Sequence, residues 1–93
     1  MQVAIQLARS LREYAQCEGE LHCTATTIAE ALRELHQRHP AVYQSICDET
    51  GAVRRHINLF VNSRWVPARE PQGLAAPLTE GDVVTIFPAV SGG

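Results

Sequence analysis

The chain has 93 residues, of which 45% are hydrophobic and 19% are charged, and its formal net charge at pH 7 is −2. This composition is typical of one small folded domain and excludes a disordered or low-complexity chain. The mixed charge gives no basic surface for nucleic acid, no apolar run is long enough to predict a membrane span, and the N-terminus does not resemble a signal peptide.

The first part of the chain predicts two strands that pair as a hairpin. Over residues 2–7 apolar and polar side chains alternate, which is the pattern of a half-buried strand. Residues 10–15 suit a turn or a short helical corner. Alternation returns after Gly19, over residues 20–24, so a second strand is expected to pair with the first.

One main helix is predicted in the middle of the chain. Thr27 and Glu30 have the spacing of a capping box, in which the hydroxyl accepts a helical amide and the carboxylate reaches back to the cap. Apolar side chains then recur at helical spacing on a single stripe: Ile28, Ala31, Leu32 and Leu35. Pro40 is expected to end this helix, and residues 41–46 can form one further helical turn.

The second half of the chain predicts the remaining strands. The strongest strand pattern covers residues 55–62, and a tight turn leads from it into residues 65–66. A loop over residues 67–77 and a turn at residues 80–82 precede a last strand over residues 83–87. This order fits an α+β β-grasp, a mixed four- to five-stranded sheet with one main helix packed on one face and the last strand beside the first.

The sequence is expected to divide into a folded domain over residues 1–88 and a flexible tail over residues 89–93. The tail ends in Gly92 and Gly93, so no side chain crowds the terminal carboxylate. Five extended residues span about 17 Å. Such a tail can carry its carboxylate into a narrow active site of another protein while the folded domain stays outside.

A family resemblance rests on three segments: Leu59-Phe60-Val61-Asn62, Leu78-Thr79-Glu80-Gly81-Asp82 and Val84-Thr85-Ile86-Phe87-Pro88-Ala89-Val90-Ser91-Gly92-Gly93. With these segments the chain resembles the ThiS/MoaD-type sulfur carrier family of β-grasp, ubiquitin-like proteins. An insertion over residues 40–55 makes it most similar to the cysteine-biosynthesis sulfur carriers that partner a cysteine synthase. The small subunit of molybdopterin synthase, a protein of molybdenum cofactor biosynthesis, is the nearest competitor.

The resemblance implies the chemistry of the tail. In that interpretation an E1-like enzyme adenylates the Gly93 carboxylate with ATP and Mg²⁺, and a sulfur donor then converts it to a thiocarboxylate. A partner synthase, cysteine synthase-like or the large subunit of molybdopterin synthase, takes the sulfur. The chain itself would be a cytoplasmic carrier, monomeric when free, with no bound cofactor and no enzymatic activity. The alternatives are a ubiquitin-like modifier joined to lysines through Gly93 and a plain interaction domain.

A carrier needs a surface on which its partners dock. Strand alternation places three aromatic side chains on the outward face, and the resemblance adds the residues that lead into Gly92 and Gly93. The expected partner-binding residues are Phe87, Trp65, Phe60, Pro88, Ala89, Val90 and Ser91. An exposed aromatic residue near the tail is typical of an interface anchor. Alternatively, Trp65 caps the edge of the core or packs on the loop over residues 67–77.

The other reactive groups have simpler interpretations. Three cysteines, an odd number without a CxxC pair, predict free thiols rather than a disulfide framework or zinc site: Cys17, Cys23 and Cys47. A persulfide-accepting cysteine is the alternative. The four histidines lack a completing cysteine or carboxylate, so no metal is expected, and no catalytic motif occurs. Some of the arginines are expected to form either a patch that recognises an acidic surface of a partner or an ordinary solvated face: Arg54, Arg55, Arg64 and Arg69.

Overall fold

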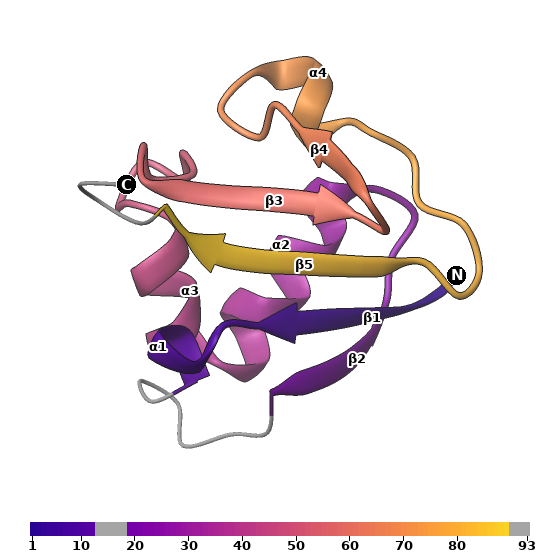
Figure 1. Ribbon diagram of the computed structural model, residues 1–93, viewed down its shortest axis with the longest axis horizontal. Helices are drawn as coiled ribbons and strands as arrows, with labels where there is room; N and C mark the ends of the chain where they lie inside the picture. Colours follow the sequence, from indigo (N-terminus) through magenta and orange to yellow (C-terminus); the bar gives the residue numbers. More distant parts are fainter. Residues whose placement is uncertain (13–18, 90–93) are drawn as a thin grey trace.

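The computed structural model describes residues 1–12 and 19–89. Its five strands are β1 (Gln2–Leu7), β2 (Glu20–Thr24), β3 (Ile57–Val61), β4 (Arg64–Val66) and β5 (Val83–Pro88). They form one sheet in the order β2-β1-β5-β3-β4, in which β1 and β5 are parallel and the other neighbours are antiparallel. The mixed β-grasp sheet is therefore confirmed, with the last strand beside the first (Figure 1).

Helices cover one face of this sheet. In the described part of the chain they are α1 (Arg9–Arg12), α2 (Ile28–Arg38), α3 (Pro40–Ile46) and α4 (Pro71–Leu74). Figure 1 shows α2 and α3 together behind the sheet. The predicted apolar stripe of α2 is buried, and it packs with the inward side chains of the strands into a single core. No helix in residues 1–12 and 19–89 is long and apolar enough to cross a membrane.

The cap of α2 differs in one contact from the predicted capping box. The Thr27 hydroxyl accepts the Glu30 amide at 3.2 Å, as expected. The Glu30 carboxylate, however, accepts the amide and the hydroxyl of Thr26, at 2.7 and 2.8 Å, and so binds the residue before the cap. These hydrogen bonds lower the pKa of Glu30. Entry into the helix is thus fixed by two adjacent threonines rather than one.

Pro40 both ends α2 and begins α3. The helix stops at Arg38, as predicted, and Pro40 then occupies the first turn of the next helix, where its missing N–H is no loss. The predicted further turn is confirmed as a helix of seven residues. Val42 and Ile46 are both 0% exposed. The insertion after the main helix therefore contributes to the core instead of looping outside it.

The prediction of an irregular loop over residues 67–77 is wrong because it contains α4. Pro71 lies at the start of this short helix, where its fixed φ suits the first turn. Gly73 lies so close to the preceding chain that an added Cβ would be 1.9 Å from the Pro67 carbonyl oxygen. The signal for α4 was present in Pro71, but the surrounding proline and glycine residues outweighed it.

The strand β5 lies in the centre of the sheet between β1 and β3. Its inward residues Val84 and Ile86 are 1% and 0% exposed, as predicted. At its start, the main-chain amide of Val83 donates to Asn62 Oδ1 at 3.1 Å, and Asn62 Nδ2 donates to Asp82 Oδ1 at 3.2 Å. The other Asp82 oxygen accepts the Thr79 amide at 2.9 Å. The predicted turn before β5 is thus a hydrogen-bonded anchor for the strand.

Candidate functional site

The candidate site begins where β5 ends. In the last register pair Pro88 lies opposite Ile57, and the Ala89 amide then donates to the His56 carbonyl oxygen at 2.6 Å. Hydrogen bonding to the sheet therefore reaches Ala89, the first residue of the expected tail. The predicted site residues Gly92 and Gly93, and the predicted partner-binding residues Val90 and Ser91, lie outside the described residues.

Three aromatic side chains lie on the face of the sheet opposite the helices. Phe60 and Phe87, from neighbouring strands, stack with ring centroids 5.5 Å apart and their planes 17° from parallel. Trp65 is the register partner of Phe60 on β4 and is 56% exposed, so it is not part of the core. We call Phe60, Trp65 and Phe87 the aromatic patch. The stacked phenyl rings and the exposed indole together offer a large apolar area for contact with another protein.

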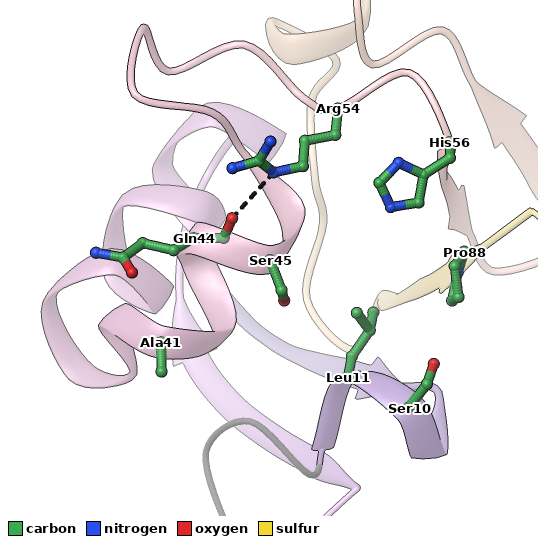
Figure 2. Close-up of a pocket in the computed structure, with 8 residues that line it drawn as sticks. All are labelled: Ser10, Leu11, Ala41, Gln44, Ser45, Arg54, His56 and Pro88. Atoms are coloured by element: carbon green, nitrogen blue, oxygen red, sulfur yellow. Dashed lines mark hydrogen bonds between the residues drawn. The ribbon is translucent and has the colours of Figure 1, made fainter.

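A broad groove opens beside the end of β5 (Figure 2). We call it the tail-exit groove; it has a volume of about 1010 Å³ and is lined by residues of α1, α3, the segment before β3 and β5, among them Ser10, Ser45, Arg54, His56 and Pro88. It was missed at the sequence level because α1 and α3 are brought to this edge only by the fold. The sequence signal available for it was the basic run that directly precedes β3.

Arg54 is held in place on one side of the tail-exit groove. Its Nε donates to the Gln44 carbonyl oxygen at 3.0 Å, as drawn in Figure 2. Its own amide donates to the Ile46 carbonyl oxygen at 2.8 Å, so both main chain and side chain bind the end of α3. Ser45, on the same helix, donates its hydroxyl to the Val42 carbonyl oxygen at 2.6 Å. The groove therefore has a fixed wall.

The four arginines do not form one patch. Arg54 and Arg55 precede β3, at the end of the sheet where Ile57 pairs with Pro88. Arg64 pairs with Val61 at the opposite end of β3, and its charge contributes to lowering the pKa of Asp82 there. Arg64 is therefore separated from Arg54 and Arg55 by the length of β3, and the hypothesis of a single patch that includes all four arginines is wrong.

The described cysteines are poorly suited to accept sulfur. Cys23 and Cys47 are free and buried, at 6% and 1% exposure. Burial raises the pKa of both thiols, that of Cys47 to about 11. At neutral pH they are protonated, whereas the thiolate is the reactive form. Cys17 lies outside the described residues.

The histidines form no metal site in the described part of the chain. No group of three or more potential ligands occurs among residues 1–12 and 19–89. The His36 ring stacks on Tyr43 with centroids 4.2 Å apart, which joins the end of α2 to α3. This stacked pair is therefore part of the packing between the two helices.

The comparison with protein families agrees with this geometry. The model of the ThiS family matches residues 5–93, which include all of β5 and the tail. The chain belongs to the ThiS family. Because the match runs through Gly93, it covers the segment that the structure leaves undescribed, and it agrees with the ThiS/MoaD-type resemblance seen in the sequence.

Two kinds of relative are similar to this chain in sequence. The sulfur carrier protein CysO of Mycobacterium tuberculosis is 28% identical over 95 residues, which cover all of both chains. Small archaeal modifier protein 3 of Haloferax volcanii is 33% identical over 67 residues, covering 72% of this chain and 70% of the relative. This ThiS family member is therefore related both to a sulfur carrier and to a modifier protein.

A solved structure shares the fold over nearly its whole length. The crystal structure of the BexX/CysO complex from Amycolatopsis orientalis contains a chain that is 30% identical and superimposes with a TM-score of 0.81. The match covers 98% of this chain and 99% of that chain. In that relative a protein of this fold is seen in complex with another protein.

Proposed function

We propose that this protein is a sulfur carrier whose Gly93 carboxylate is adenylated by an E1-like enzyme, converted to a thiocarboxylate and used as a sulfur donor in the synthesis of cysteine or a related metabolite. The observation that carries the proposal is the end of β5. The strand β5 is paired on both edges, by β1 and β3, and hydrogen bonding to the sheet continues through Ala89; four further residues of a ThiS family sequence end in Gly-Gly. The similarity to CysO over the full length supports it.

The reaction divides between the carrier and its partner. The Gly93 carboxylate attacks the α-phosphorus of ATP and expels pyrophosphate, and a sulfur nucleophile then attacks the acyl carbon and expels AMP. The product is a thiocarboxylate with a nucleophilic sulfur. ATP and Mg²⁺ belong to the activating enzyme, and the carrier supplies the acyl group and its position. The carrier is a co-substrate of its partners and not itself an enzyme.

The glycines suit this reaction because the acyl carbon must fit a narrow channel. A Cβ at residue 92 or 93 would stand beside the carbon under attack and would restrict the backbone angles available there. An extended tail of residues 90–93 reaches about 14 Å beyond Ala89. The β-grasp body therefore stays outside the channel while Gly93 reaches the active site.

The aromatic patch is the docking surface in this proposal. Phe60, Trp65 and Phe87 bind the partner, and Pro88 and Ala89 together with Val90 and Ser91 enter or line its channel. Trp65 is exposed and rich in apolar area, which are the properties of an interface anchor. The CysO chain in the BexX/CysO complex supports partner binding by this fold. The free carrier is monomeric in this proposal.

The test of the proposal is intact-mass measurement. The full chain is incubated with an E1-like enzyme, ATP, Mg²⁺ and a sulfide source, and its mass is expected to change by the exchange of one oxygen for sulfur. Omission of ATP is the control and should leave the mass unchanged. If neither an adenylate nor the sulfur product forms with an enzyme that charges a CysO protein, the sulfur carrier proposal is wrong.

A second candidate is a ubiquitin-like modifier, which the similarity to small archaeal modifier protein 3 favours. The same adenylate would serve it, but the acyl group would pass to a lysine amine and form an isopeptide bond. Pull-down of the tagged chain from cells under reducing conditions separates the two functions. A free small species that carries sulfur indicates the carrier, and a ladder of covalent conjugates indicates the modifier.

A further inference from the structure

The tail-exit groove lies where a partner must approach if the tail enters its active site. Only four residues separate Ala89 from the end of the chain, and they span about 14 Å when extended. A protein that binds Gly93 therefore brings the mouth of its channel within that distance of Ala89. Pro88, the neighbour of Ala89, is itself part of the groove wall. The groove thus lies under the rim of the bound partner.

The groove differs from the rest of the molecule in charge. The whole chain has a net charge of −2, yet among the described residues that line the groove there is no carboxylate. Its charged side chain is Arg54 and its imidazole is His56. The rest of the described lining is both polar and apolar: Ser10, Gln44, Ser45, Leu11, Ala41 and Pro88. Arg55, which adjoins Arg54, is exposed as well. A surface of this kind is complementary to carboxylates.

Arg54 has donors available for such a ligand. Its Nε is used by the Gln44 carbonyl oxygen, and within residues 1–12 and 19–89 no hydrogen bond or ion pair occupies its two terminal nitrogens. The charge of Arg54 acts on Asp48, but that carboxylate already accepts the Thr50 hydroxyl and amide and the Ala52 amide. The guanidinium edge that remains free has the planar geometry that pairs with a carboxylate.

We propose that the tail-exit groove is a second docking surface, which binds acidic side chains at the channel mouth of the activating enzyme. This inference rests on the proposed sulfur carrier function and goes beyond it, because it assigns a partner contact to Arg54 and Arg55, away from the aromatic patch. The groove orients the domain about the tail axis, and its positive charge speeds encounter with an acidic rim.

Two groups of variants test the charge. Arg54→Gln combined with Arg55→Gln removes both positive charges, and Arg54→Lys keeps the charge of Arg54 while it loses the hydrogen bond to Gln44. Arg64→Gln is the matched control, since it removes one arginine at the far end of β3. Thermal unfolding of each variant checks the fold, and ATP–pyrophosphate exchange with the activating enzyme gives KM and kcat for the carrier.

The double variant is expected to raise KM for the carrier about 5-fold at low salt, with kcat unchanged, because exposed ion pairs steer and hold the encounter complex. Arg54→Lys keeps the charge but loses the planar guanidinium, so its KM should rise less than that of the double variant, and Arg64→Gln should stay within about 2-fold of the original KM. High salt should remove the difference. An unchanged KM in the double variant, or an equal rise in Arg64→Gln, overturns the groove proposal.

The outcomes also separate this inference from the proposed function. If the unmodified chain is not adenylated at all, the sulfur carrier proposal fails; if it is adenylated and the double variant behaves identically, only the groove proposal fails. The chain's own tail is the competing occupant. In NMR spectra of the enzyme-free full chain, shifts of the Gly92 and Gly93 amides on Arg54→Gln would assign the groove to that tail and overturn the proposal.

Discussion

The two ends of β5 are built in opposite ways. At its start Asn62, Asp82 and Thr79 form a network of side-chain hydrogen bonds around Val83. At its end a single main-chain hydrogen bond, from Ala89 to His56, is the last contact of the described chain with the sheet. One end is fixed by side chains, and the other passes directly into the tail. The folded domain therefore anchors the start of β5, while the end of β5 leads into the tail that we propose to react with partner enzymes.

The largest expected effect is on the rate of thiocarboxylate formation, and it comes from a change in the tail that follows β5. Gly93→Ala places a Cβ beside the acyl carbon, and small misplacements of a reacting group cost about 100-fold in rate. Thiocarboxylate formation, followed by intact mass over time, should therefore slow by roughly that factor. The thermal unfolding midpoint should not change, because residue 93 is four positions beyond Ala89, the last described residue that hydrogen-bonds to the sheet. A wild-type rate in Gly93→Ala would contradict the steric role of the glycine.

The aromatic patch gives the next largest effect. Trp65→Ala removes an exposed anchor and should weaken binding to the activating enzyme by about 2 kcal/mol, or roughly 30-fold in Kd, as for a typical hot spot. Its free energy of unfolding should change by no more than about 0.5 kcal/mol, since the indole is 56% exposed. Calorimetric titration and thermal unfolding measure the two quantities. Unchanged binding would show that Trp65 is not part of the docking surface.

At the fixed end the expected effect is on stability alone. Asn62 has a φ of 57°, in the left-handed region, and its side chain binds both Val83 and Asp82. Asn62→Ala should cost about 1–2 kcal/mol, from lost hydrogen bonds and the strained φ. Asn62→Gly tolerates that φ and should cost less. Denaturant unfolding gives both values, and slower sulfur transfer in either folded variant would break the contrast between the two ends.

The smallest expected effect is a pH dependence of the same network. Hydrogen bonds from the Thr79 amide and from Asn62 lower the pKa of Asp82 in the folded protein below its value in the unfolded chain, about 3.9. Asp82 therefore stabilises the fold above that value, and its contribution is lost as the pH falls through the lower, folded pKa. The melting temperature of Asp82→Asn should fall less steeply below about pH 4 than that of the original chain. Identical profiles would show that Asp82 is not coupled to folding.

Much of the fold was predictable because local patterns and the final packing agree. The alternating apolar residues of β1 and the apolar stripe of α2 are buried as expected, and the last strand lies beside the first. The cap contact from Glu30 to Thr26 and the helix α4 were not predicted. In both cases the local sequence was compatible with two conformations, and contacts with the surrounding chain determined which one forms.

The candidate site was predictable in part. The outward positions of Phe60, Trp65 and Phe87 follow from alternation along a strand, but the stacking of Phe60 on Phe87 depends on the pairing of β3 with β5. The tail-exit groove combines α1, α3 and the segment before β3, which are separate in sequence. A motif search cannot find such a surface, because topology alone brings those segments together. The same topology separates Arg64 from Arg54.

The most direct test is to locate the sulfur after charging. Fragmentation of the intact charged protein in a mass spectrometer assigns the added sulfur to a particular residue. We expect it on the carboxyl group of Gly93, with none on the buried thiols of Cys23 and Cys47 or on Cys17. Sulfur bound as a persulfide to any cysteine, with an unmodified Gly93, would contradict the central claim that the terminal acyl group is the carrier.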